Sequence, residues 1–542
     1  MVTPAQASRR ASRPTDLPPA EAGGQMTHRQ TLEALSGLLL AMFTAFLSST
    51  IVANALPTII PELHGTQNQY TWVVTATLLA STASTPIWGK LSDLVSKKLL
   101  VQIAITVFTV GSVLAGFSQS VDQLIIWRSL QGLGLGGLQS LVVIVIAAMT
   151  SPRERGRYSG PIAAVMSVAT VAGPLLGGLI VDTDWLGWRW CFFACVPLAV
   201  ISLVVMQLTL KLPVIRREVS IDYLGAALIA GGVCDLLIWV TLAGKQFAWG
   251  SSTSLLLVAL GVVLLAAAVI TETRVKDPII PLRLFRDRTT ALATVASIAV
   301  GTALFGGSVF LGQYFQIARG YSPTAAGLLT LPMIVGSMVS STVSGSLITR
   351  WGKWKVFLVV GSICMLAGFA LLGTIDHNTN MVLLGAFLLV LGIGMGMTMQ
   401  NLVLAVQNTV APTDLGTASS TVAFFRSLGG SIGVSVLGAV LATRVSDLTL
   451  SGLTAAGVPL PAGGGSGSAE IGISNLNQLP GPIADVVRGA YGDATALIFL
   501  ISAALSIITV LAVLVIREVP LRTQNAMQQQ AQPEKADATA ES

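Results

Sequence analysis

The chain has 542 residues, of which 53% are hydrophobic and only 10% are charged. Soluble globular domains have about 25% charged residues, so this composition leaves too little polar surface for a water-soluble fold. The net charge is +6, but the basic residues lie in short gaps between apolar segments. Nothing around them resembles a DNA-reading module, so we expect no nucleic-acid partner.

Fourteen apolar segments approach or exceed the length of about 20 residues that a helix needs to cross a bilayer. We expect spans at 32–56, 71–91, 99–118, 121–149, 158–182, 189–210, 221–243, 253–272, 289–318, 322–349, 355–375, 380–409, 416–442 and 494–516. Most Lys and Arg residues lie in the two flanks and in every second gap. Because basic residues favour the cytoplasmic side, we expect a multi-pass protein of the plasma (inner) membrane with both termini in the cytoplasm.

The remaining segments are polar. Residues 1–30 contain no cleavable signal-peptide pattern, and we expect them and the Gln-rich tail 517–542 to be disordered. The one long outer gap, 443–493, is rich in Gly, Ser and Pro in its middle, which predicts a mobile loop ending in a short surface helix at 483–491. The four cysteines lie within spans without metal-type clustering, so we expect no metal and no cofactor.

The gap after the second span contains a specific motif, Gly89-Lys-Leu-Ser-Asp93, followed by three more residues and two lysines. Glycine allows a tight turn at the membrane surface. Asp93 can cap a helix start or pair with a base in the next basic gap, Arg153 or Arg155. The plain alternative is an ordinary basic loop. A decayed copy begins at Gly345, which indicates an internal repeat of two similar halves.

Two further motifs lie within spans. In the span 121–149, Arg128 and Gln131 precede closely spaced glycines. A buried Arg is costly and should face a wet cavity or a partner, or else reach the headgroups. In the span 158–182, Gly173, Pro174 and Gly177 predict close helix packing with a weakened backbone ladder. The alternative there is generic helix packing.

Taken together, these motifs resemble those of the major facilitator superfamily. Leu94 and Ser96 depart from its loop signature. The pattern around Arg128 looks like the signature in which the Arg lines the cavity and influences proton transfer, and the pattern from Gly173 resembles that of antiporting exporters. The stretch 187–197 is similar to the fourteen-span drug:proton antiporters of the EmrB/QacA type.

The resemblance implies an all-α fold of fourteen transmembrane helices. We expect one six-helix bundle at 31–211, a linker with two extra helices at 212–276, and a second six-helix bundle at 277–516, in a monomer. It also implies a secondary active exporter that alternates between inward- and outward-open forms by proton antiport. No Walker-type phosphate loop and no nucleophile–base constellation occurs in the sequence, so we expect neither ATP hydrolysis nor an enzyme.

The proton-binding residue does not stand where the resemblance would put it. Ser48 replaces the usual acid of the first span, and Ser cannot titrate there. The one acid deep in another span is Asp235, within 221–243. A carboxyl group in hydrocarbon suits a proton carrier, so Asp235 and Arg128 are the candidates for proton coupling. The alternative for Asp235 is a neutral acid hydrogen-bonded to a neighbour.

The substrate cavity should be lined by polar, aromatic and Met side chains from both halves. The candidates are Phe46, Asn54, Trp72, Gln131, Met166, Tyr314, Gln316, Gln400, Asn401 and Arg426. Such a lining suits bulky, small-molecule amphiphiles, and the scarcity of acids favours neutral, zwitterionic or anionic ones. Two other functions stay open: a dedicated exporter of an endogenous antibiotic, lipid or amino acid, and a membrane sensor or scaffold that transports nothing.

Overall fold

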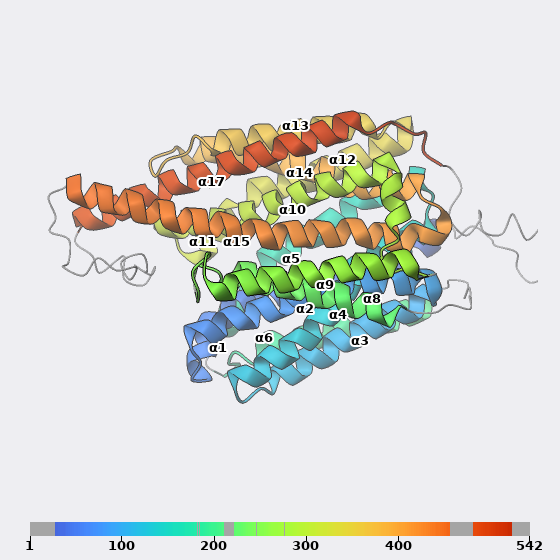
Figure 1. Cartoon of the computed structure of the whole chain (residues 1–542), viewed down its shortest axis with the longest axis horizontal. Coiled ribbons are helices and arrows are strands. Elements are labelled where there is room, and N and C mark those ends of the chain that lie inside the picture. The colour runs from blue at the N-terminus through green and yellow to red at the C-terminus, as the bar shows by residue number, and fades with distance from the viewer. Residues whose placement is uncertain are drawn as a thin grey trace, which may run out of the picture.

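The computed structural model describes residues 28–181, 183, 185–210, 222–244, 246–275, 277–455 and 481–522. In these ranges the regular secondary structure is helical, apart from one isolated β-bridge between Ala243 and Phe247. The predicted all-α fold class is confirmed. The long helices run along the long axis of the molecule (Figure 1).

Seven helical segments are described in the N-terminal half. They are α1 (His28–Glu62), α2 (Gln67–Leu94), α3 (Lys97–Gly116), α4 (Val121–Met149), α5 (Pro152–Val181), α6 (Trp190–Phe193) and α7 (Cys195–Thr209). The predicted span 189–210 corresponds to α6 and α7 together. α4 packs between α2 and α3, while α1 packs against α5 and α7. Two clusters of buried apolar side chains hold this half together.

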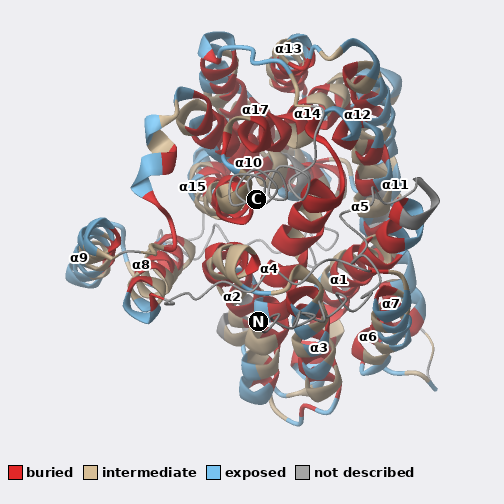
Figure 2. Ribbon diagram, turned by 90° about the vertical axis from the view of Figure 1, so that its right-hand side faces the viewer, coloured by how far each residue is buried: buried red, intermediate tan, exposed pale blue. Residues whose placement is uncertain are grey.

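The C-terminal half begins after the inserted pair α8 (Tyr223–Leu242) and α9 (Ser252–Arg274). It contains η1 (Leu282–Arg286), α10 (Arg288–Gln313), η2 (Tyr314–Ala318), α11 (Pro323–Leu329), α12 (Leu331–Trp351), α13 (Lys355–Leu372), α14 (Met381–Thr409), η3 (Pro412–Asp414), α15 (Leu415–Ala455) and α17 (Gly481–Val515). Figure 2 shows the two halves as separate groups of helices, with α8 and α9 beside them on one flank.

Thirteen helices in the described part of the chain are long and apolar enough to cross a membrane. α2 is absent from this set, although its 28 residues are long enough. Its middle is rich in Ser and Thr, which lowers its hydropathy. Packing explains how such a helix is accommodated, because α2 contacts α4, α8 and α15 and has other helices on several sides.

The predicted outer loop 443–493 is where the sequence-based boundaries differ most from the structure. α15 continues to Ala455, and α17 begins at Gly481, so both flanks of that loop are helical. Val445 of α15 is buried in an apolar cluster with Ala494 of α17, and Tyr491 packs against it. This contact stabilises both extensions, and Figure 1 shows α15 and α17 projecting together at one end. The short surface helix expected at 483–491 is the first part of α17. The predictions for 1–27, 211–221, 523–542 and the middle of the predicted loop, 456–480, lie outside the described residues.

Contacts within the two halves repeat, as the copy at Gly345 predicts. A Cβ atom on Gly136 of α4 would overlap the backbone of Ser81 on α2, and one on Gly396 of α14 would overlap Ser337 on α12. The Ser84 hydroxyl donates to the Leu133 carbonyl (3.4 Å). In the other half, the equivalent bond runs from Ser340 to Ile393 (3.0 Å). The pairs α2–α4 and α12–α14 are therefore built alike.

We expect Gly136→Ala and Gly396→Ala to destabilise the protein by similar amounts, about 1–3 kcal/mol each, because each added methyl group meets backbone atoms that cannot move aside. The measurement is thermal unfolding of the purified protein in detergent. Gly385→Ala, also on α14, is the control, since its Cβ would make only an ordinary contact 3.7 Å from Pro332. Wild-type stability in both variants would contradict the assigned packing.

Candidate functional site

Hydrogen bonds join the two halves at the end of the bundle where α2 and α12 end and α5 and α15 begin. We call this the basic end, because Lys90 and Arg153 lie there. The Asp93 carboxylate accepts hydrogen bonds from the backbone N–H groups of Gly416 (2.9 Å) and Thr417 (2.8 Å) and from the Thr417 hydroxyl (2.8 Å). A side chain of the N-terminal half thus caps the first turn of α15 in the C-terminal half.

Two opposing effects act on the Asp93 carboxyl group. Burial is the larger effect, and the net result is a pKa raised to about 6. The hydrogen bonds from Thr417 and Gly416 and the charge of Lys97 lower the pKa and only partly offset burial. The partial positive charge at the N-terminus of α15 also favours the carboxylate. Asp93 therefore changes its charge at mildly acidic pH while this contact is formed.

Glycine lets α2 and α15 approach closely enough for the Asp93 contact. A Cβ atom on Gly89 would overlap the Ser420 side chain, and one on Gly416 would lie 2.6 Å from Oδ1 of Asp93. The first residue of the predicted motif is therefore required by a contact between the halves, in addition to any turn.

Arg153 makes the complementary contact between α5 and α12. Its guanidinium donates to the carbonyl oxygens of Thr349 (Nε, 3.1 Å) and Arg350 (Nη2, 3.4 Å), in the last turn of α12. A cation is favourable at the negative end of a helix. Beside it, Gly156 and Gly345 pack backbone to backbone, and a Cβ atom on either one would overlap the other.

A buried polar chain continues from α5 into the C-terminal half. Arg155 donates to the Gln407 side chain on α14 (3.0 Å) and to the Thr150 and Ala147 carbonyls. Gln407 in turn donates to the Ser419 hydroxyl on α15 (2.9 Å). The sequence left open whether Asp93 caps a helix or pairs with a base. In the structure Asp93 is a cap, and Arg153 and Arg155 bind carbonyl and amide oxygens.

Arg128 lies inside the N-terminal half and is only 4% exposed, which is incompatible with a side chain that reaches the headgroups. Its Nη1 donates to Gln131 (2.5 Å), whose amide donates to the hydroxyls of Ser48 (3.0 Å) and Ser112 (2.6 Å). Its Nε is buried without a hydrogen-bond partner among the described residues. Ser48, the position of the missing acid, therefore belongs to the same hydrogen-bonded network as Arg128.

One cavity, of about 340 Å³, lies between α5 and the C-terminal half; we call it the α5 cavity. Three predicted residues, Met166, Gln316 and Gln400, line it. Ser337 and Ser341 also line it and were not predicted from the sequence. These two are spaced four apart on α12, and that polar spacing was a usable signal.

A second cavity, of about 790 Å³, lies where α2, α8, α10 and α15 meet; we call it the seam cavity. Its α8 side is formed by Leu237, Val240 and Thr241, and the turn after α8 contributes Trp249. This part of the lining was not predictable from the sequence, because α8 belongs to the inserted pair outside the two bundles.

The other cavity candidates whose side chains the structure describes line neither of these two cavities. Tyr314 is fully buried and donates to the Asp376 carbonyl (2.7 Å), and Asn401 donates to the Met397 carbonyl (2.6 Å). Phe46 packs against the apolar clusters of the N-terminal half, and Trp72 packs against the cluster around α8. Gln131 belongs to the Arg128 network, and the structure describes no position for the Asn54 side chain.

The two remaining charged candidates, Asp235 and Arg426, lie on different helices. Oδ2 of Asp235 is buried between α8 and α9 beside Gly261, with no hydrogen-bond partner in the described part. Arg426 of α15 is half-buried and makes no hydrogen bond or ion pair to another described residue.

Gly173, the first residue of the glycine motif in α5, makes the close helix packing that the sequence predicts. A Cβ atom on Gly173 would overlap Thr50 of α1, whose hydroxyl donates to the Ala169 carbonyl (3.1 Å). Gly177 is buried, and the Pro174 side chain lies outside the description.

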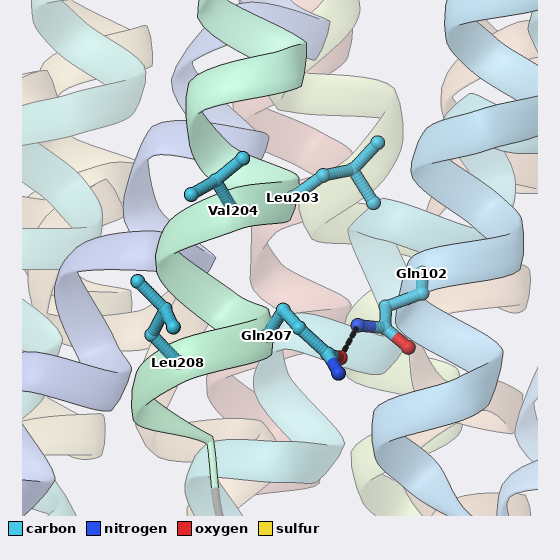
Figure 3. Close-up of a pocket in the computed structure, with 5 residues that line it drawn as sticks. All are labelled: Gln102, Leu203, Val204, Gln207 and Leu208. Atoms are coloured by element: carbon cyan, nitrogen blue, oxygen red, sulfur yellow. Dashed lines mark hydrogen bonds between the residues drawn. The ribbon is translucent and has the colours of Figure 1, made fainter.

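A shallow groove on the outside of the N-terminal half is formed by Gln102 of α3 and by Leu203, Val204, Gln207 and Leu208 of α7 (Figure 3). The Gln102 amide donates to Gln207 (2.7 Å) and ties the two helices together. α3 and α7 pack against helices of the N-terminal half and line neither the α5 cavity nor the seam cavity, so we assign the groove no substrate. The described residues contain no group of three or more His, Cys, Asp or Glu that could hold a metal ion.

The helical halves, the contacts that repeat between them and the cavities beside their junction are the features of a membrane transporter. Residues 38–434 match the sequence model of the Major Facilitator Superfamily. The chain belongs to this family of transporters, which is not a family of enzymes, and is a multi-pass membrane protein that carries small substrates.

Curated relatives cover most of the chain. An MFS-type transporter of Mycobacterium tuberculosis, described as uncharacterized, is 38% identical over 94% of this chain and 73% of its own length. The multidrug transporter protein MdtP of Bacillus subtilis is 33% identical over 83% of this chain and 82% of its own. The solved human organic anion transporter MFSD10 has a TM-score of 0.57 at 14% identity, covering 88% and 99% of the two chains, which supports the fold.

We expect Arg128→Ala to lower the initial transport rate about tenfold or more, because Ala leaves the Gln131–Ser48–Ser112 network without its cation. Arg128→Lys should fail as well, since a point charge does not reproduce the planar donor. The measurement is substrate flux in proteoliposomes at matched protein content. Arg444→Ala, an exposed position on α15, is the control. Full transport by Arg128→Ala would refute the functional role.

We expect acid to stabilise the contact between Asp93 and α15. The pKa of Asp93 is about 6 in the contact and about 3.9 in water, so a proton binds more tightly when the contact is formed. The equilibrium constant for forming the contact should therefore rise as pH falls through 6, by about fourfold between pH 7.5 and 5.5. Hydrogen–deuterium exchange of the Gly416 and Thr417 amides, corrected for intrinsic rates, measures it.

Asp93→Asn should remove this pH dependence, because the amide cannot ionise. Exchange in the middle of α14 is the internal control. Protection of the α15 amides that weakens with acid in the wild type would contradict the assignment.

Proposed function

We propose that the protein exports small amphipathic molecules by alternating access, driven by proton antiport. The observation that carries this proposal is the asymmetry of the junction between the halves. The described hydrogen bonds that Asp93 accepts and that Arg153 and Arg155 donate lie at the basic end, whereas the seam cavity lies near the opposite ends of its helices.

The distribution of charge supports an orientation. Basic residues concentrate at the end that the contacts close, and such residues favour the cytoplasm. On this orientation the basic end is cytoplasmic, in the plasma membrane, and the conformation is closed to the cytoplasm. Export then requires the Asp93 and Arg153 caps to break, so that the two halves rock apart at the basic end and close at the other.

The names of relatives support efflux. The MdtP protein of B. subtilis is named a multidrug transporter, and a second B. subtilis relative, 30% identical over 91% of this chain, is named multidrug resistance protein 3. Met166, Gln316 and Gln400 give the α5 cavity a neutral, adaptable surface. We therefore propose neutral, zwitterionic or anionic amphiphiles as substrates, and no strongly cationic ones.

For proton coupling we propose Asp235, with Arg128 in a supporting role. Oδ2 of Asp235 is buried and without a hydrogen-bond partner in the described part. The residue precedes by two and five positions Leu237 and Val240 of α8, which line the seam cavity. Its protonation would act on the cavity through α8, since Asp235 lies on the side facing α9.

We expect Asp235→Asn to abolish uphill transport and leave substrate binding within about twofold, because the amide keeps the shape of a protonated carboxyl group but cannot ionise. Flux in proteoliposomes with an imposed pH gradient, over a panel of amphiphiles, measures the first effect. Equilibrium binding to the purified protein measures the second. Normal uphill export by this variant would rule out Asp235 as the coupling acid.

The same flux assay tests the proposed function as a whole. Wild-type flux of an amphiphile that follows the pH gradient supports antiport. Flux that ignores the gradient indicates a facilitator, and ligand binding without any flux indicates a sensor. Metabolite profiles of a deletion strain separate a multidrug exporter from a dedicated exporter of one endogenous product.

A further inference from the structure

α8 lies across the junction between the two halves. It contacts α2 of the N-terminal half and α15 of the C-terminal half. The apolar cluster around Val233 and Leu237 of α8 includes Leu79 of α2 and Phe424 of α15. The inserted pair is therefore more than a tether between the halves, because one of its helices packs against both (Figure 2).

The seam cavity opens between these same helices, towards the end opposite the basic end. Its volume of about 790 Å³ lies within the range of about 300–1,000 Å³ that is typical of small-molecule sites. Leu78 of α2 and Val309 of α10 line it and are about 40% exposed. Part of the cavity wall is thus open to solvent.

The lining carries no formal charge. Among the described residues that form it there is no Asp, Glu, Lys, Arg or His. Its inner part is apolar and aromatic, with Leu79, Leu237, Val240, Phe305 and Phe310. An ion there would exchange hydration for an apolar surface without finding a counter-charge, which is unfavourable.

Neutral polar groups complete the lining. The side chains of Tyr70, Gln313, Ser431 and Tyr491 make no hydrogen bond to other groups in the described part of the chain. They offer hydroxyl and amide groups to a ligand next to an apolar surface. A molecule with an apolar body and one or two uncharged polar groups satisfies both parts of this lining.

We propose that the seam cavity is a binding site for an uncharged amphiphile of drug size, and that α8 helps to select it. This inference deepens the proposed function by naming a substrate class and a site. Its test does not require transport, because ligand binding can be measured without a pH gradient.

The test is photolabelling of the full-length protein in nanodiscs with a diazirine derivative of a neutral alkylphenol, followed by peptide mapping. We expect saturable labelling on residues 237–249 or 430–445. Gly438→Leu should lower it about tenfold, because the added side chain fills the cavity while its Cβ lies an ordinary 3.8 Å from Phe310. Val240→Phe, which fills the cavity from α8, should do the same.

Val263→Phe, on the exposed face of α9, is the matched control and should label like the wild type. A quaternary ammonium analogue of the probe should label these segments at least tenfold more weakly. Labelling that is non-saturable, that lies elsewhere, or that is equal for the charged analogue would overturn the proposal. So would competition by added phospholipid but not by unlabelled alkylphenol, since the occupant would then be a lipid.

The outcome is independent of the flux assay. Saturable labelling of the seam cavity without any flux would leave this inference standing and refute the proposed exporter. Gradient-driven flux that is unchanged in Gly438→Leu, together with no labelling of the cavity, would support the exporter and overturn this site.

Discussion

The contact on which the rest of this structure depends is the capping of helix ends in one half by charged side chains of the other. The Asp93 carboxylate occupies the N-terminus of α15, and the Arg153 guanidinium occupies the C-terminal carbonyls of α12. Each satisfies backbone groups that a helix end leaves unpaired, and each has the sign that the helix dipole favours. Such caps can break and re-form while each half stays rigid, because breaking either cap does not require a helix to unfold.

Glycines allow close helix contacts both within each half and between the two halves. Gly136 and Gly396 hold equivalent helix pairs together inside each half, whereas Gly89, Gly156 and Gly345 bring the two halves into backbone contact at the basic end. The polar chain from Arg155 through Gln407 to Ser419 adds a buried connection there. Towards the opposite end, the cavities take the place of such contacts. The inserted α8 packs across the junction between α2 and α15.

The sequence predicted the fold well, because apolar length and basic gaps report directly on helices in a bilayer. It left open whether Asp93 caps a helix or pairs with a base, and it could not identify α15, since the capping partner lies more than 300 residues away. Arg128 was recognisable as a buried charge, yet its bond to Gln131 depends on tertiary packing. Composition also misled: the Gly/Ser/Pro-rich gap predicted a loop from 443, but α15 continues to Ala455 because Val445 packs against α17. Tyr314 looked like a cavity aromatic and is a core residue.

The most direct test of the account is a pair of distances measured in the same protein during transport. Spin labels at Arg157 and Lys353, both exposed, report on the basic end, and labels at Gln119 and Asn378 report on the opposite end, in a background with the four cysteines replaced by serine. The account predicts that substrate and a pH gradient produce a population in which the first distance lengthens as the second shortens. Active transport with both distances unchanged, or with both changing in the same direction, would contradict it.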